Sequence, residues 1–272
     1  MRSIKGEILR YRFLTDSEVS YLASTDPRFL RDPDEFCPTC GGEKSYKFRG
    51  TVYECDCQLQ WQLWKHYSVS NIGSTYQRLD WVDYTSEERG PFETAILFRD
   101  NFKELISRGL GLLFGGGVGV GKTMLLSLLL KDLVKSGVSC YSSTATQLIE
   151  TFDNGYHDYA RREFFEEKTF KSEVLLLDDL GRERETVHAK EVIETILRRR
   201  TQAGQTTLIT TNKSKQDLEA IYPPQVLSLI FEKNKGIWWN IEDFRAPETH
   251  RGPSMGSKQI NEVLSGERRP IF

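Results

Sequence analysis

The pattern of apolar residues is weak and irregular up to about residue 90 and becomes regular after it. After that point, short continuous apolar runs typical of buried strands alternate with segments of helical spacing. The predicted strands cover 110–114, 138–142, 174–177 and 206–211, and the predicted helices cover 92–107, 124–134, 146–151 and 187–200. Such alternation predicts an α/β fold of three layers, in which helices cover both faces of a mostly parallel sheet.

The segments on either side of this domain carry weaker patterns. An amphipathic stretch at 16–23 predicts a short helix, and 237–241 is expected to be a half-buried strand. We divide the chain into four parts, namely an N-terminal module (1–67), a linker (68–90), the α/β domain (91–250) and a C-terminal tail (251–272). The tail is expected to be mobile.

A complete phosphate-loop motif lies between the strand at 110–114 and the helix that follows it. Its residues are Gly116, Gly117, Val118, Gly119, Val120, Gly121, Lys122 and Thr123, which match G-x-x-x-x-G-K-[ST]. In this setting successive backbone N–H groups cradle a triphosphate, and glycine is needed because side chains would block that approach. We expect ATP here, with Lys122 on the β- and γ-phosphates and the Thr123 hydroxyl on Mg²⁺.

Polar side chains follow two of the predicted strands. Asp178 and Asp179 end the strand at 174–177 in a Walker B pattern, so Asp178 is expected to anchor Mg²⁺ and Asp179 to orient or deprotonate the attacking water. Paired aspartates are also common turn formers, but the phosphate loop upstream favours the catalytic interpretation. Asn212 ends the next strand and can hydrogen-bond the γ-phosphate; capping of a helix at 213–220 is the alternative.

Four of the five cysteines lie close together in the N-terminal module, at Cys37, Cys40, Cys55 and Cys57. Four thiolates close a tetrahedral Zn²⁺ site and leave no position for water, so we expect a structural zinc in a small ribbon-like domain. His66 is an alternative ligand. We also expect the module to recruit a partner protein, since it carries aromatic side chains that suit protein docking as well as DNA binding: Tyr46, Phe48, Tyr53, Trp61 and Trp64.

Charge and composition limit the remaining classes of function. The formal net charge is −2, so any contact with nucleic acid needs a local patch. One mixture of aromatic and basic residues suits stacking on single strands, although core packing is its more common role: Tyr156, Tyr159, Arg161, Arg162, Phe164, Phe165 and Lys168. Arg198, Arg199 and Arg200 end a helix, where cations complement the dipole or contact a subunit or DNA phosphates. Because no apolar run would span a bilayer and 1–20 does not resemble a secretion signal, a cytoplasmic location is expected.

The order of these motifs resembles the AAA+ ATPases, and within them the DnaC/IstB-like helicase-loader family of bacteria and phages. The resemblance covers about residues 71–247 and includes Leu177-Asp178-Asp179-Leu180-Gly181, Thr210-Thr211-Asn212 and a late Glu242-Asp243-Phe244-Arg245. It implies an ATPase that assembles with its own copies into a ring or spiral, contacts single-stranded DNA and places a replicative hexameric helicase. It also implies that Asn212 is the sensor-1 residue and that Arg245 is directed toward the nucleotide.

The chain departs from this family in one helix. Family members usually carry an arginine there that reaches the neighbouring subunit's γ-phosphate, whereas 226–232 contains none. Because such an arginine contributes about 10³- to 10⁵-fold in rate, we expect weak hydrolysis unless Arg199, Arg200, Lys233 or Lys235 substitutes.

Two alternatives to a helicase loader stay open. One is an IstB-like transposition helper ATPase that binds DNA and recruits a transposase. The other is an interaction protein whose ATP site only switches its conformation. A small-molecule kinase is disfavoured, since no acceptor-binding segment or lid is visible in the sequence.

Overall fold

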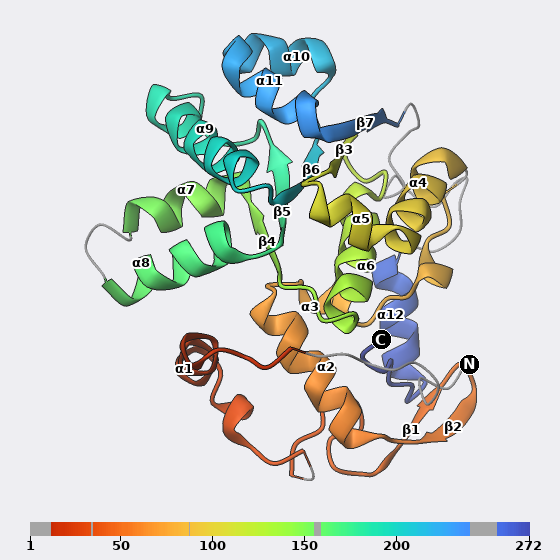
Figure 1. Ribbon diagram of the computed structural model, residues 1–272. Helices are drawn as coiled ribbons and strands as arrows, with labels where there is room; N and C mark the ends of the chain where they lie inside the picture. The colour runs from red at the N-terminus through yellow and green to blue at the C-terminus, as the bar shows by residue number, and fades with distance from the viewer. Residues whose placement is uncertain (1–11, 34, 87, 155–158, 240–254) are drawn as a thin grey trace.

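The centre of the molecule is a parallel sheet of five strands (Figure 1). The computed structural model describes residues 12–33, 35–86, 88–154, 159–239 and 255–272. The sheet has the order β4-β5-β6-β3-β7 and all neighbouring strands are parallel. Its strands are β3 (Gly111–Gly115), β4 (Cys140–Thr144), β5 (Val174–Leu180), β6 (Thr206–Thr211) and β7 (Asn234–Trp238). The carboxyl ends of β5, β6 and β3 therefore meet at one edge of the sheet.

Alternate residues of each strand enter two separate cores, as a period of two requires. Leu112 and Phe114 of β3 join one core, and Leu113 joins the other. The first core is covered by α2 (Cys57–Val69), α4 (Arg89–Asp100) and α6 (Lys122–Lys135). The second is covered by α7 (Ala145–Asn154), α8 (Tyr159–Glu166), α9 (Val187–Gln202), α10 (Lys215–Ile221) and α11 (Pro224–Lys233). The predicted three-layer α/β fold is confirmed.

Most elements of the α/β domain lie within a few residues of their predicted positions. The predicted helix at 92–107 is divided at Asn101 into α4 and α5 (Phe102–Ser107). The strand expected at 237–241 begins earlier, since β7 pairs with β3 from Asn234 to Trp238. In the ranges that the structure describes, no helix has the length and apolar content of a membrane span.

The N-terminal module contains a β-hairpin followed by α2. Strands β1 (Ser45–Phe48) and β2 (Thr51–Glu54) pair antiparallel. Arg49 and Gly50 connect them, and both have positive φ (49° and 76°), as a two-residue hairpin turn requires. The aromatic side chains that we expected to form a docking surface are mostly internal, because Tyr46, Phe48 and Trp61 are buried. That expectation is wrong for these three residues.

The module and the linker pack directly on the α/β domain. Leu63 and Tyr67 of α2, together with Leu79 and Tyr84 of the linker, are buried in the same core as the leucines of α6. Contact on this side explains why α6 is apolar around most of its circumference. Short elements complete the connection: α3 (Ser74–Gln77) and the 3₁₀ turn η3 (Trp81–Asp83).

Helix α1 (Asp16–Thr25) and the 3₁₀ turn η2 (Pro27–Leu30) precede the cysteines, and the helix confirms the prediction for 16–23. It begins with a capping box between Thr15 and Glu18. The Glu18 carboxylate is buried and pairs with Arg12 and with Lys168, which lies in the π-helical turn η4 (Glu167–Lys171) after α8. This ion pair attaches the start of the chain to the opposite end of the sheet from β7.

The C-terminal tail is ordered, so the prediction that it is mobile is wrong for residues 255–272. It forms α12 (Met255–Leu264) and then crosses the hairpin, where Arg268 N–H donates to the Lys47 carbonyl oxygen at 2.7 Å. Ile271 is buried in the core beside α6. The Phe272 ring lies edge-on to Phe48. The reason for the order is that these two apolar side chains fill space between the module and the α/β domain.

Arg200 is a structural residue at the end of α9. Its side chain is 0% exposed, and its guanidinium donates to carbonyl oxygens of Thr169 (2.7 Å), Ser172 (3.1 Å) and Thr206 (2.6 Å) and to Thr207 Oγ1 (3.1 Å). Burial lowers the pKa of Arg200 to about 9. The expectation of a solvated cap or an intermolecular contact is therefore wrong for this arginine.

We predict that Arg200→Met lowers the free energy of unfolding by at least about 3 kcal/mol, because several buried carbonyl groups lose their donor. Urea denaturation followed by circular dichroism measures this. Arg198→Met is the matched control; its side chain is exposed and pairs with Glu194, so a change within about 0.5 kcal/mol is expected. Equal unfolding midpoints for the two variants would contradict the structural role.

Candidate nucleotide site and metal centre

The phosphate loop connects β3 to α6 and has the backbone conformation that its glycines predict. Gly116 and Gly121 have φ of 141° and 96°. A Cβ at Gly116 would lie 2.9 Å from the Trp239 Cβ, and one at Gly121 would lie 3.0 Å from the Tyr84 ring. A side chain at either position would strain the backbone and collide with these aromatic residues.

One of the two valines inside the loop fixes it to the protein. Val120 is fully buried in the core beside α6, whereas Val118 is half exposed. The loop is therefore held to the core at Val120, while Gly117 and Val118 are exposed to solvent. Because α6 begins at Lys122, the N–H groups of its first turn point to the same place.

Lys122 is the cation of this site. Its Nζ lies within the loop and donates to the carbonyl oxygens of Gly116 (2.8 Å) and Gly117 (2.6 Å) and to Asn212 Oδ1 (2.8 Å). The side chain is only 5% exposed. An ammonium group next to a glycine-rich loop and a helix N-terminus, whose backbone N–H groups are free to donate, is the arrangement that binds the phosphates of a nucleotide.

Thr123 and Asp178 meet, although 55 positions separate them in the sequence. The Thr123 hydroxyl donates to Asp178 Oδ1 at 2.9 Å, and the Thr210 hydroxyl donates to the same oxygen. Burial raises the pKa of Asp178, while these two hydrogen bonds act in the opposite direction. A carboxylate and a hydroxyl in contact are hard oxygen ligands, so this pair fits Mg²⁺.

Asp179 lies at an irregularity in β5. The pairing of β5 with β6 shifts between Leu177 and Leu180, and Asp179 has φ of +56°, which is uncommon outside glycine. Its Oδ1 accepts from Asn212 Nδ2 at 2.9 Å, and its Oδ2 pairs with Arg182 at 3.2 Å. Asn212 therefore links Asp179 to Lys122, and all five polar residues predicted in the loop and at the strand ends lie together.

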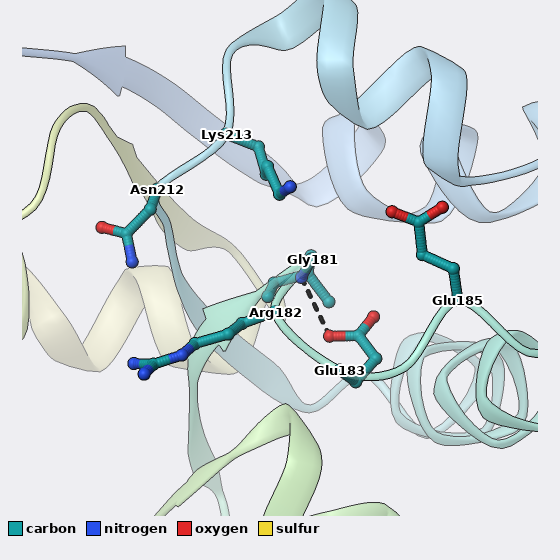
Figure 2. A pocket seen from close by; sticks show the side chains of 7 residues that line it. Gly181, Arg182, Glu183, Glu185, Asn212 and Lys213 are labelled. Atoms are coloured by element: carbon teal, nitrogen blue, oxygen red, sulfur yellow. Dashed lines mark hydrogen bonds between the residues drawn. The ribbon is translucent and has the colours of Figure 1, made fainter.

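A cleft of about 250 Å³ opens beside Asn212 (Figure 2). Arg182 and Asn212 line one side of it, and Glu183 and Glu185 line the other. Glu183 is buried, accepts from the Gly181 N–H at 3.0 Å and contacts the Tyr222 hydroxyl. Burial raises the pKa of the Glu183 carboxyl. Sequence reasoning missed Arg182, Glu183 and Thr210, because nothing in their local pattern separates them from ordinary turn and strand residues.

The remaining predicted cations have different surroundings. Arg245 lies outside the described residues. Arg200 is excluded as a substitute for the missing arginine by its complete burial. Arg199 forms an ion pair with Glu166, and Lys233 forms one with Glu232; the side chains of both pairs are partly exposed. Lys235 is exposed.

The four cysteines of the N-terminal module form one cluster. Their sulfur atoms all lie within 4.8 Å of one another, and the separations of Cys37–Cys55 and Cys40–Cys57 are 3.7 and 3.5 Å. A tetrahedral ion with Zn–S bonds of about 2.3 Å separates its sulfurs by roughly 3.8 Å, so the cluster fits Zn²⁺.

Hydrogen bonds to Cys40 favour its thiolate form. Burial by itself raises the pKa of Cys40, but hydrogen bonds from the Gly42 backbone and from Cys57 lower it overall to about 7. Gly41 and Gly42 both have positive φ, as the predicted turn requires. His66 is not part of the cluster; its ring nitrogens lie 2.8 Å from the Gln62 and 3.0 Å from the Arg12 carbonyl oxygens. Its prediction as a ligand is wrong.

Comparison with known sequences shows which proteins this domain resembles. The profile of the family described as IstB-like ATP binding protein matches residues 103–229. The chain is 29% identical to the replicative helicase loader DnaI of Bacillus subtilis over 149 aligned residues. The aligned segment covers 54% of this chain and 47% of DnaI. It is 22% identical over 171 residues to the uncharacterized protein YdaV of Escherichia coli, covering 63% of this chain and 68% of YdaV. The chain thus spans about half the length of DnaI.

Solved structures agree with this placement. The crystal structure of the DnaC helicase loader is 29% identical, with a TM-score of 0.56, and covers 61% of this chain and 99% of its own. The crystal structure of DnaI shares the fold, with a TM-score of 0.54 and 24% sequence identity. The match covers 61% of this chain and 93% of the DnaI chain. The sheet and the helices around it therefore match AAA+ helicase-loader structures, and residues 103–229 resemble an IstB-like ATP-binding domain, with the DnaI and DnaC helicase loaders among the similar proteins.

Proposed function

We propose that this protein is an ATP-dependent loader that places a replicative hexameric DNA helicase on single-stranded DNA and works as a self-assembling AAA+ ATPase. The observation that carries the proposal is the contact of the phosphate loop with two strand ends, Thr123 with Asp178 and Lys122 with Asn212. Similarity to DnaC and DnaI supports the choice of partner.

Each polar group has a role in the proposed hydrolysis. The N–H groups of 116–123 and the Lys122 ammonium bind the phosphates, while Thr123 and Asp178 hold Mg²⁺, which neutralises phosphate charge when bound. Asp179 orients the attacking water, and Asn212 fixes the Asp179 carboxylate through its amide. We retain Arg245 as the late arginine directed toward the nucleotide.

Contacts with DNA and with the helicase are assigned to different ends of the molecule. Tyr159 and Arg162 of α8 are exposed and provide a ring and a cation for single-stranded DNA. The hairpin of the N-terminal module lies far from α8 (Figure 1) and exposes Val52 (69%) between Thr51 and the half-buried Tyr53. We assign this hairpin to the helicase.

A transposition helper is a second candidate, because the matching family profile is that of IstB-like proteins. Such a helper binds double-stranded DNA and a transposase, so strand preference and the partner separate it from a loader. An ATP-switched interaction protein is a third candidate, which the missing arginine at 226–232 favours. Stimulation of hydrolysis by single-stranded DNA would argue against a pure switch.

We predict weak ATP hydrolysis by the isolated protein, with turnover below about 1 s⁻¹, because no arginine in α11 reaches a neighbouring γ-phosphate. Phosphate release measured with and without single-stranded DNA tests this. Turnover of tens per second without DNA or a partner would contradict the prediction.

We predict that Val52→Glu weakens the complex with the helicase at least ~10-fold, since a charge replaces an apolar contact residue. Light scattering coupled to size-exclusion chromatography, with ATP, Mg²⁺ and the replicative helicase of the same genome, measures the complex. Val187→Glu is the control, because Val187 is equally exposed (74%) at the start of α9. Point variants are preferable to removal of 1–67, which would expose the core around α6.

An unchanged complex with Val52→Glu, or equal loss with Val187→Glu, would refute the assignment of the hairpin. Binding of a fluorescent ATP analogue should be the same in both variants and in the wild type. This readout separates loss of the partner site from loss of the fold.

We predict that the purified protein contains about one zinc ion per chain and that Cys40→Ser removes most of it, because three remaining thiolates cannot close the site. Elemental analysis by mass spectrometry measures the zinc content. Cys140→Ala is the control, since Cys140 is a buried cysteine of β4 outside the cluster. Equal zinc content in Cys40→Ser and the wild type would show that the cluster is not the site.

A further inference from the structure

The Walker B carboxylates lie in a bulge of β5. Leu177 pairs with Ile209 and Leu180 pairs with Thr211, so Asp178 and Asp179 together stand opposite one residue, Thr210. In a bulge of this kind, one residue of the longer strand loses its regular ladder partner. The backbone at Asp179 therefore needs another acceptor for its N–H group.

The Thr210 side chain supplies that acceptor. Its Oγ1 accepts from the Asp179 N–H at 2.9 Å and donates to Asp178 Oδ1. A hydroxyl has one proton to donate and two lone pairs, so both bonds can exist together. Thr210 is 0% exposed, which excludes bulk water from replacing either bond.

Thr210 positions the Asp178 carboxylate by a direct hydrogen bond and the Asp179 carboxylate through a hydrogen bond to the Asp179 backbone. The bond to Asp178 Oδ1 fixes the same oxygen that receives the Thr123 hydroxyl, and so sets the Asp178 carboxylate against the phosphate loop. The bond from the Asp179 N–H holds a residue with φ of +56°, a conformation that is uncommon outside glycine. That conformation directs Asp179 Oδ1 to the Asn212 amide.

Neighbouring threonines of β6 do not share this arrangement. The Thr211 hydroxyl donates to the Leu180 carbonyl oxygen at 2.7 Å, and the Thr206 hydroxyl donates to the Leu110 carbonyl oxygen at 3.2 Å. Each of these two hydroxyl groups therefore donates to a backbone carbonyl oxygen, and neither contacts a carboxylate. Thr206 is equally buried and lies at the opposite end of the strand, so it offers a matched comparison.

We infer that Thr210 is a positioning residue for ATP hydrolysis, whose single hydroxyl sets the orientation of both Asp178 and Asp179. This role rests on the ATPase activity proposed above. It affects the hydrolysis step and the Mg²⁺ requirement, because the loop and Lys122 would hold the nucleotide phosphates and Thr210 would not contact them. Binding of nucleotide without Mg²⁺ is therefore independent of Thr210.

The test compares Thr210→Val and Thr210→Ala, which lack the hydroxyl, with Thr210→Ser, which keeps it, and with the control Thr206→Val. Single-turnover hydrolysis gives the rate, a fluorescent ATP analogue in EDTA gives the affinity, and a Mg²⁺ titration gives the half-saturating concentration. We expect the two hydroxyl-free variants at Thr210 to hydrolyse ATP ~10- to 100-fold more slowly and to need more Mg²⁺. Their affinity in EDTA should stay within ~3-fold, and Thr210→Ser should stay within ~3-fold of the wild-type rate.

A purely structural threonine gives a different pattern. If Thr210→Val slows hydrolysis no more than Thr206→Val, or if Thr210→Ser is as slow as Thr210→Ala, the inference is overturned. Normal hydrolysis by the wild type in the same experiment shows that only this inference has failed. Absence of hydrolysis by the wild type overturns the proposed ATPase itself, and the role of Thr210 with it.

Discussion

A partly buried hydrogen bond between Thr123 and Asp178 joins the start of α6 to the end of β5, and the candidate site depends on it. The strand order brings the two together, since β6 alone separates β5 from β3 in the sheet. Lys122 and Asn212 make a second connection between the loop and the end of β6. The groups in both contacts are of types that bind phosphate or magnesium. The bonds that connect the loop to the ends of β5 and β6 therefore also organise the candidate site.

Two buried cations of the molecule donate hydrogen bonds to backbone carbonyl oxygens and have no carboxylate partner among the ion pairs of the described residues. Arg200 is one, and Lys131 in α6 is another, since its Nζ donates to the carbonyl oxygens of Tyr76 (3.1 Å) and Leu79. Burial lowers the pKa of Lys131 to about 7. These bonds tie the linker to the helix of the phosphate loop, which makes the N-terminal module part of one packed body around α6. Movement of the module would therefore act directly on α6.

Local patterns in the sequence were sufficient for the parts of the site that each occupy one segment. The phosphate loop, Asp178 and the cysteine pairs could be singled out because the ligands that such motifs bind set their spacing and residue types. The roles of Thr210, Arg182 and Arg200 depend on which strands are neighbours and on one bulge, and no local pattern encodes either. The burial of Tyr46, Phe48 and Trp61 and the docking of Ile271 were missed for the same reason, since both depend on contacts between distant segments.

The most direct measurement is a crystal structure with a non-hydrolysable ATP analogue and Mg²⁺. We expect a triphosphate against the backbone of 116–123, with the Lys122 ammonium on its β- and γ-phosphates and Mg²⁺ held by the Thr123 hydroxyl and Asp178. Nucleotide bound elsewhere, or a loop that stays closed on Lys122 with nucleotide in excess, would contradict it.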